Sequence, residues 1–220
     1  MKKIFYILCF SLAVLLSACE KDESSNSSNG HEYVDLGLSV KWATCNVGAD
    51  SPEDYGDYFA WGETQPKSYY WKESYKWFDY KQNYLTKYCT DSDYGTVDNK
   101  TVLELTDDAA NANWGGSWRM PTNAEQIELV EKCTWTWGKK KGINGCTVTG
   151  PNGNSIFIPA TGYRYQSDLV LLSSLGYYWS NSLSSQKSHY VDMLCFFPEG
   201  AGYDYFDNRT VGLPVRPVLP

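Results

Sequence analysis

The feature that most constrains the fold of this chain is a dense run of aromatic residues with no regular period. Between Tyr55 and Tyr94, about 14 of 40 residues are Tyr, Trp or Phe, against 16% for the whole chain of 220 residues. No helical or strand period persists through this segment. Long loops without regular structure tend to be functional or disordered, and so many rings argue against disorder. The pattern therefore predicts a long, ordered loop region.

Short alternating segments on both sides of this region predict antiparallel strands. The segment 33–43 alternates and has turn chemistry at Gly37, which is typical of a hairpin. Asn144-Gly145 and Asn152-Gly153 are hairpin-turn dipeptides that bracket an alternating segment. The final strand contains prolines, so it should lie at an edge or at the start of a sheet. Further strands are expected at 155–158, 177–180, 189–196 and 211–218.

Two helices are expected in the middle of the chain. Thr106 is suited to cap the first, because two aspartates follow it in the first turn, and Gly115 can end this helix. The second follows Thr122, where Thr-Asn-Ala-Glu forms a capping box, and its apolar face extends to Cys133. Two helices with short antiparallel sheets and long loops predict an α+β fold.

The first residues have the pattern of an export signal. Lys2 and Lys3 precede an apolar run from Ile4 to Leu16, which is too short for the ~20 residues that span a bilayer. The run ends in Leu-Ser-Ala-Cys19, which resembles the lipobox of bacterial lipoproteins. An ordinary cleaved signal with an incidental cysteine is the alternative. We expect three parts: a signal peptide (1–18), a lipidated flexible tether (19–30) and a single folded domain (31–220).

The segment after Cys19 predicts where the protein resides. Glu20-Lys21-Asp22-Glu23 resembles the surface-export signal of some Gram-negative lipoproteins, and the Ser/Asn-rich residues 24–30 have the composition of a flexible tether. We therefore expect an outer-membrane, cell-surface lipoprotein. The membrane would be its partner through acyl chains on Cys19, because more than one chain gives stable anchoring.

Charge and cysteine content exclude several other partners. The formal charge is -7, and removal of Lys2 and Lys3 leaves 17 basic and 26 acidic residues, or -9. Such an acidic chain gains nothing from phosphate, so no nucleic-acid partner is expected. No zinc-like spacing occurs, and neither a metal nor a cofactor is expected. A Cys133–Cys146 disulfide is an open alternative to buried free thiols, which we favour for Cys45, Cys89, Cys133, Cys146 and Cys195.

An ordered set of motifs resembles the major paralogous domain (FISUMP-like) family of bacterial surface lipoproteins. The resemblance covers nearly all of residues 31–220 and implies a C-type-lectin-like fold related to Lcl-type C-terminal domains, with paired terminal strands and loops displayed on one side. The calcium-binding triplets of sugar-binding lectins are absent, so calcium-dependent binding is not implied. The motifs lie at 33–43, 55–64, 114–122, 152–156, 162–164, 178–180 and 215–218.

The leading functional hypothesis is a non-catalytic surface module that binds a glycan or a protein through its aromatic-rich loops. Tyr and Trp present rigid amphipathic faces that stack on sugars or anchor protein partners. The alternative for these rings is that they pack a loop-rich core. The favoured contacts are Tyr70, Trp71, Tyr75, Trp77 and Tyr80.

Two other classes of function compete with this hypothesis. A structural or assembly subunit of a surface appendage or uptake complex would offer an exposed strand edge. A glycan-acting hydrolase would need two carboxylates about 5–9 Å apart. We find no catalytic motif, and spacing singles out no pair among Asp54, Asp57, Glu63, Asp79, Asp192 and Asp204.

Overall fold

A computed structural model describes residues 26–185 and 189–220. The expected signal peptide and the expected lipidation site at Cys19 lie outside these residues. Within the described part, no helix is both long and apolar enough to span a membrane.

The two ends of the folded domain meet in one four-stranded sheet of order β1-β2-β3-β14. The predicted hairpin at 33–43 is confirmed, with Gly37 at a φ of 75° in the connection. The predicted edge position of the last strand is also confirmed, because β14 pairs only with β3 within this sheet. The predicted extent of this strand, 211–218, is wrong, since only Val218 and Leu219 form it. The strands are β1 (Ser27–Ser28), β2 (His31–Val34), β3 (Lys41–Ala43) and β14 (Val218–Leu219).

Residues before the expected start of the folded domain at residue 31 also contact that domain. Ser27 and Ser28 pair with β2, and the indole Nε1 of Trp118 donates a hydrogen bond to the Ser28 carbonyl at 2.9 Å. The Asn29 amide donates to the Trp114 carbonyl. A polar segment buries little apolar surface, yet its backbone can still pair with a neighbouring strand.

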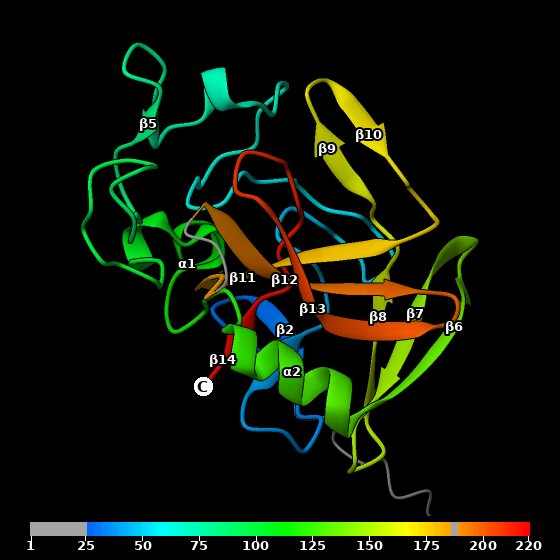
Figure 1. The fold of residues 1–220 in the computed structure, drawn as a ribbon. Coiled ribbons are helices and arrows are strands. Elements are labelled where there is room, and N and C mark those ends of the chain that lie inside the picture. Colours follow the sequence, from blue (N-terminus) through cyan, green and yellow to red (C-terminus); the bar gives the residue numbers. More distant parts are fainter. Residues whose placement is uncertain (1–25, 186–188) are drawn as a thin grey trace, which may run out of the picture.

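Two three-stranded antiparallel sheets form the body of the molecule (Figure 1). Trp135 and Trp137 of one sheet pack against Phe196 of the other, with ring centroids 5.4 and 6.3 Å apart. The first sheet contains β6 (Thr134–Lys140), β7 (Ile143–Thr149) and β8 (Ser155–Pro159). The second contains β11 (Gly176–Leu183), β12 (Tyr190–Phe197) and β13 (Gly200–Asn208).

The hairpin turn predicted at Asn144-Gly145 is wrong, although the one at Asn152-Gly153 is confirmed. The β6–β7 turn lies at Lys141-Gly142, where both residues have positive φ. Gly145 lies within β7, where an added Cβ would be 2.4 Å from the Ile158 carbonyl oxygen. This glycine therefore permits close strand contact instead of a turn.

The two expected helices exist, but only the second begins where it was predicted. Helix α2 (Asn123–Lys132) has Thr122 as its N-cap and a complete capping box with Glu125. Helix α1 (Ala109–Trp114) is capped by Asp108 and not by Thr106, which lies in a 3-10 turn, η2 (Leu105–Asp107). The Asp108 carboxylate accepts hydrogen bonds from three backbone amides, which a threonine hydroxyl cannot match.

The predicted α+β, two-helix C-type-lectin-like fold class is wrong. Strands make up 38% and helices 12% of the structure, which is a β-rich fold with many small antiparallel sheets and one curled half-barrel. Both helices are short, although their N-termini have clear capping residues in the sequence. Long strands such as β13 contain little of the alternation of polar and apolar residues, bounded by turn residues, that predicts a strand. Helix termini have local sequence signals, but strand pairing depends on distant partners.

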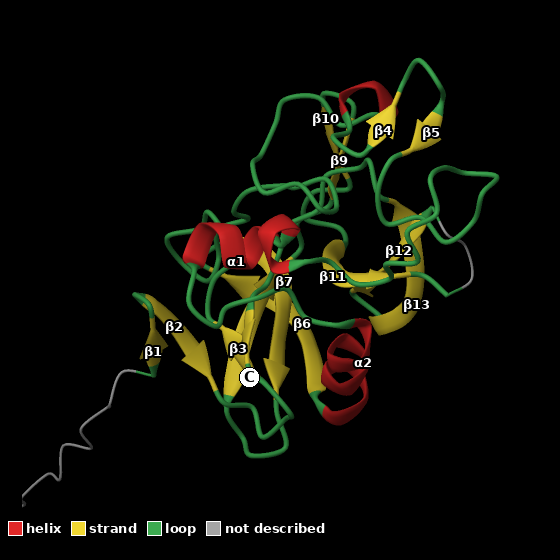
Figure 2. Cartoon of the chain, turned by 90° about the vertical axis from the view of Figure 1, so that its left-hand side faces the viewer, coloured by secondary structure: helices red, strands yellow, loops and turns green. Residues whose placement is uncertain are grey.

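The predicted ordered loop region between Tyr55 and Tyr94 is confirmed, and its two short strands, labelled β4 and β5, lie at the upper end of the molecule in Figure 2. Its regular elements are η1 (Lys72–Ser74), β4 (Phe78–Asp79) and β5 (Tyr84–Leu85). A second small hairpin, β9 (Tyr163–Tyr165) and β10 (Asp168–Val170), lies beside it, and Tyr70 bridges to Gln166. All five described cysteines are free, so the Cys133–Cys146 disulfide is not present.

Candidate functional site

The five aromatic residues predicted as ligand contacts do not share one surface. Tyr70 and Tyr75 are buried, with 1% and 3% of their surface exposed. The Tyr70 hydroxyl donates to the Tyr58 carbonyl at 2.5 Å, and the Tyr75 hydroxyl donates to the Trp61 carbonyl at 2.7 Å. These two rings therefore hold the loop region together and cannot contact a ligand at its surface, as the core-packing alternative expected.

The other three predicted contacts are more accessible but lie apart. Trp77 is half-buried, its Nε1 donates to the Gly62 carbonyl at 3.0 Å, and Lys76 lies over its ring. Trp71 is half-buried and packs edge-on against Tyr165 of β9, 5.1 Å between ring centroids. Tyr80 is 60% exposed near the tip of the β4–β5 hairpin. Sequence reasoning thus located an aromatic region but not a common binding face.

An open cleft of about 1190 Å³ lies beside this region. One wall comes from the loop after β5, and the other comes from the end of β11, the residues that follow it and His189, directly before β12. The lining consists mainly of hydroxyl groups and exposed apolar side chains. It comprises Thr90, Asp91, Ser92, Tyr94, Val97, Thr101, Val102, Ser182, Leu183, Ser184, Ser185 and His189.

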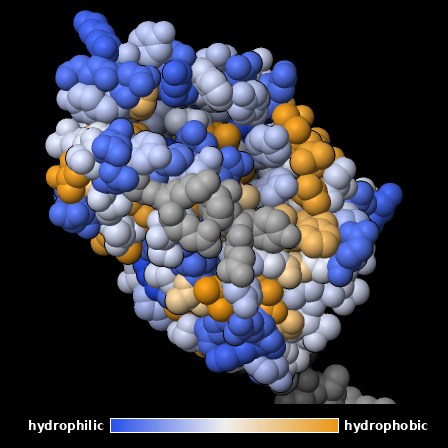
Figure 3. Space-filling view, viewed as in Figure 1, coloured by the Kyte–Doolittle hydropathy of each residue, from blue (hydrophilic) through white to orange (hydrophobic). Residues whose placement is uncertain are grey.

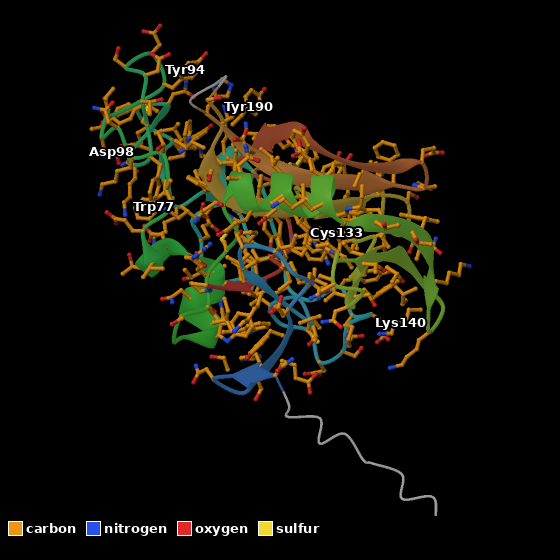
Figure 4. All side chains as sticks on the ribbon, turned by 90° about the horizontal axis from the view of Figure 1, so that it is seen from below. Trp77, Tyr94, Asp98, Cys133, Lys140 and Tyr190 are labelled. Atoms are coloured by element: carbon orange, nitrogen blue, oxygen red, sulfur yellow. The ribbon has the colours of Figure 1, made fainter. Side chains whose placement is uncertain are left out.

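Three aromatic rings in tilted contact lie at one side of the cleft, and two of them, Tyr94 and His189, line it. The His189 ring lies 4.4 Å from Tyr94 and 4.3 Å from Tyr190, between centroids, so it joins the loop wall to the start of β12. Tyr94 is 42% exposed and offers a ring to the cavity. Figure 4 shows Tyr94 and Tyr190 at the same end of the molecule, far from Lys140 at the tip of the β6–β7 hairpin.

A smaller pocket of about 360 Å³ shares Tyr94 and His189 with the cleft. Its lining is more apolar, and it includes two cationic side chains. The Tyr94–His189 pair therefore lies between the two cavities and borders both. The small pocket is lined by Lys72, Phe78, Asn83, Leu85, Asp93, Tyr94, His189, Asn208, Arg209 and Thr210.

Backbone contacts pin the loop wall of the cleft to the rest of the fold. The Leu183 amide donates to the Thr101 carbonyl at 2.8 Å, and the Leu103 amide donates to the Asn181 carbonyl at 3.0 Å. The Asp98 carboxylate accepts from the amides of Tyr88 and Cys89. Burial alone would raise the pKa of Asp98, but these amide donors outweigh it and lower the pKa. These hydrogen bonds hold the loop wall of the cleft in one conformation.

An ion-pair network around Asp107 stabilises the loop that forms this wall. The Asp107 carboxylate accepts from Lys87 Nζ at 2.6 Å, from Tyr88 hydroxyl at 2.7 Å and from Lys76 Nζ at 3.2 Å. Burial opposes ionisation of Asp107, but these donors lower its pKa below the ordinary value. The charge on Asp107 thus anchors the lysines that flank the buried ring of Tyr88.

The acids considered for a hydrolase are not gathered in the cleft, whose lining includes a single carboxylate, Asp91. Glu63 forms an ion pair with Lys67, Asp79 caps the β4–β5 turn, and Asp192 accepts from Asn123. The side chain of Asp204 lies outside the described part of the structure. In that part, no group of three His, Cys, Asp or Glu residues could hold a metal ion.

Two exposed leucines form a separate apolar patch at the end of β10. Leu171 and Leu172 are 44% and 36% exposed, and apolar side chains gather toward the upper right of the face in Figure 3. Neither leucine lines the cleft or the small pocket. This patch is therefore a surface of different character from the hydroxyl-rich cleft.

Sequence reasoning missed the cleft because its walls come from segments about 90 residues apart. The only local sequence signal on the wall formed by the end of β11 is a Ser-rich run, Ser180 to Ser185. Such a run is common in loops and does not by itself predict a binding site. Comparisons with known proteins add no assignment: no family model matches the chain, and neither a curated protein nor a solved structure matches it significantly.

Proposed function

We propose that this chain is a non-catalytic, surface-tethered binding module and that its cleft takes a glycan. The observation that carries this proposal is the cleft of about 1190 Å³, whose lining combines seven serine, threonine or tyrosine hydroxyls with an exposed tyrosine ring. Hydroxyls exchange hydrogen bonds with the hydroxyls of a sugar, and an aromatic ring stacks on its C–H face.

The shape of the recess favours a glycan over a folded protein partner. Small-molecule sites are concave and bury most of the ligand, whereas protein interfaces centre on a patch of aromatic or apolar anchors. The exposed Leu171 and Leu172 resemble such apolar anchors, but they line neither the cleft nor the small pocket. A glycan chain could enter an open cleft without rearrangement of its pinned walls.

The position of the first described strand fits a surface tether. In Figure 2, β1 lies at the left side of the molecule, away from β4 and β5 at the top. If Cys19 carries a lipid, as the lipobox resemblance implies, the chain leads from the membrane to β1 and not directly to the β4–β5 end. The motif resemblance to surface lipoproteins of the major paralogous domain family supports the same role.

The proposal is tested by a glycan array probed with the full mature chain in detergent. We expect Tyr94→Ala to lower binding by about tenfold or more, because ring stacking contributes roughly 1–3 kcal/mol and is lost with the ring. Tyr80→Ala is the matched control, since Tyr80 is more exposed but lines neither cavity. Melting temperatures of both variants verify folding.

The outcomes separate the alternatives. Loss of binding in Tyr80→Ala but not in Tyr94→Ala would return the site to the tip of the β4–β5 hairpin. Capture of a specific protein from the cell surface, with no glycan bound at all, would contradict the glycan proposal and favour an assembly role.

A further inference from the structure

We propose that the small pocket is a subsite for the carboxylate of an acidic sugar, whose neighbouring units occupy the cleft. This inference rests on the proposed glycan-binding function. It names the class of glycan: one that carries a uronic or sialic acid.

The first support is the positive charge of Arg209, a buried residue among those that line the pocket. Arg209 lines the pocket and is only 1% exposed. Its Nη1 donates to the Tyr88 carbonyl at 3.0 Å and to the Lys87 carbonyl at 3.3 Å, and its guanidinium carbon lies 5.4 Å from the Trp61 ring. These contacts fix the position of the buried charge before a ligand arrives, and a cation close to the pocket attracts a carboxylate through the low-dielectric interior.

The second support is the charge at the rim. Lys72 also lines the pocket, and none of the described acids forms an ion pair with it. Asp93 is the one acid among the lining residues, so cations outnumber acids there. The segment 67–87 contains five lysines and two acids in a chain of net charge -7. Three of those lysines pair with Glu63, Glu104 and Asp107, which leaves Lys72 and Lys81 as its remaining cations.

The third support is the remaining lining, which suits the body of a sugar. Phe78, Leu85 and Tyr94 supply apolar surface for a ring face, while Asn83, Asn208 and Thr210 supply amide and hydroxyl groups. The volume of about 360 Å³ lies within the range of about 300–1000 Å³ that is usual for ligand sites. Tyr94 and His189 line both cavities, so the pocket and the cleft are neighbours, and a saccharide that occupies both would pass this ring pair.

The test compares acidic sugars with uncharged copies of themselves. An array presents oligosaccharides that end in glucuronic, galacturonic or sialic acid, each beside its carboxyl methyl ester, to the full mature chain in detergent. We expect at least one acid to bind about tenfold more tightly than its ester, because a charge-assisted hydrogen bond is about twice as strong as a neutral one. Higher salt should weaken binding of the acid and leave the ester unchanged.

Two variants localise the effect to the pocket. Lys72→Glu reverses the charge at the rim, and Asn83→Asp adds a charge at an exposed lining residue whose φ of 57° an aspartate also tolerates. Each should lower affinity for the acid about threefold to tenfold without changing affinity for the ester. Lys81→Glu is the control, because it makes the same charge change in the same loop outside the pocket.

The failures of the two proposals are distinguishable. Equal binding of every acid and its ester, or a set of ligands that is entirely neutral, overturns the carboxylate subsite and leaves the glycan-binding function standing. Acid preference that Lys72→Glu and Asn83→Asp do not reduce also overturns it. Absence of binding to every glycan on the array overturns both.

Discussion

At the scale of single residues, a few buried charges organise the aromatic loops. The Asp107 side chain is only 5% exposed, yet it accepts from two lysines and one tyrosine that come from different points of the loop region. A buried charge is stable only when it is paired and hydrogen-bonded. Asp107 therefore ties the lower part of the aromatic region to the start of α1.

Replacing Asp107 with Asn should destabilise the protein by about 2 kcal/mol at pH 7, because charged hydrogen bonds contribute roughly 1.5–3 kcal/mol. Its pKa is lowered in the folded state, so its stabilising effect is complete above the ordinary aspartate pKa and is lost as pH falls through the folded value. Urea unfolding at pH 7 and at acidic pH should show the difference between wild type and Asp107→Asn shrink in acid. Asp168→Asn, at an exposed site in β10, is the control.

At the scale of elements, the stability of the β6–β7–β8 sheet depends on how closely β7 and β8 approach each other. Gly138 of β6 and Gly145 of β7 are directly opposite each other in the register. A Cβ on Gly138 would meet nothing within 4 Å, whereas one on Gly145 would lie 2.4 Å from a carbonyl oxygen of β8 and 2.7 Å from the Phe157 ring. Two glycines in one cross-strand pair thus have different physical roles.

We predict that Gly145→Ala costs about 2 kcal/mol or more of unfolding free energy, because overpacking a close contact typically costs about 1–3 kcal/mol. Gly138→Ala should be neutral or slightly stabilising, since alanine loses less backbone entropy than glycine on folding. Thermal or urea unfolding of the two variants provides a matched comparison. Equal destabilisation would mean that strand propensity, and not the contact with β8, determines the effect.

At the scale of the whole molecule, the chain closes on itself. Val218 of β14 is fully buried, pairs with Trp42 of β3 and exchanges two backbone hydrogen bonds with Arg119. Leu219 is also buried, while Pro220 is exposed. The last residues therefore join the first sheet to the segment before α2.

Deletion of residues 218–220 should cost about 4 kcal/mol or more, because it removes two buried side chains that contribute roughly 1.5–3 kcal/mol each. This is a large part of the ~5–15 kcal/mol that stabilises a typical domain. Deletion of Pro220 alone should have little effect. Melting temperature and limited proteolysis report the difference, and similar stability of the two deletions would show that β14 is not part of the closing sheet in solution.

The candidate site could be predicted from the sequence only in part. Composition correctly indicated an ordered aromatic region. An irregular loop has no residue period, however, so the sequence does not show which of its rings are buried and which are exposed. Tyr70 and Tyr75 are held inside by hydrogen bonds to carbonyls 12 and 14 residues away, whereas Tyr94 lines the cleft in contact with His189. Such contacts depend on distant chain segments, and no local pattern encodes them.

The sequence by itself predicted a structural feature correctly where the interacting groups lie within a few residues of each other in the chain. The Thr122–Glu125 capping box, the hairpin around Gly37 and the exclusion of proline from central strands follow from rules that act over a single turn or strand. Tertiary contacts decided the β-rich architecture, the burial of the tyrosines and the pairing of Ser27 with Glu32. They also created both cavities, because strand pairing and cavity walls exist only once distant segments have met.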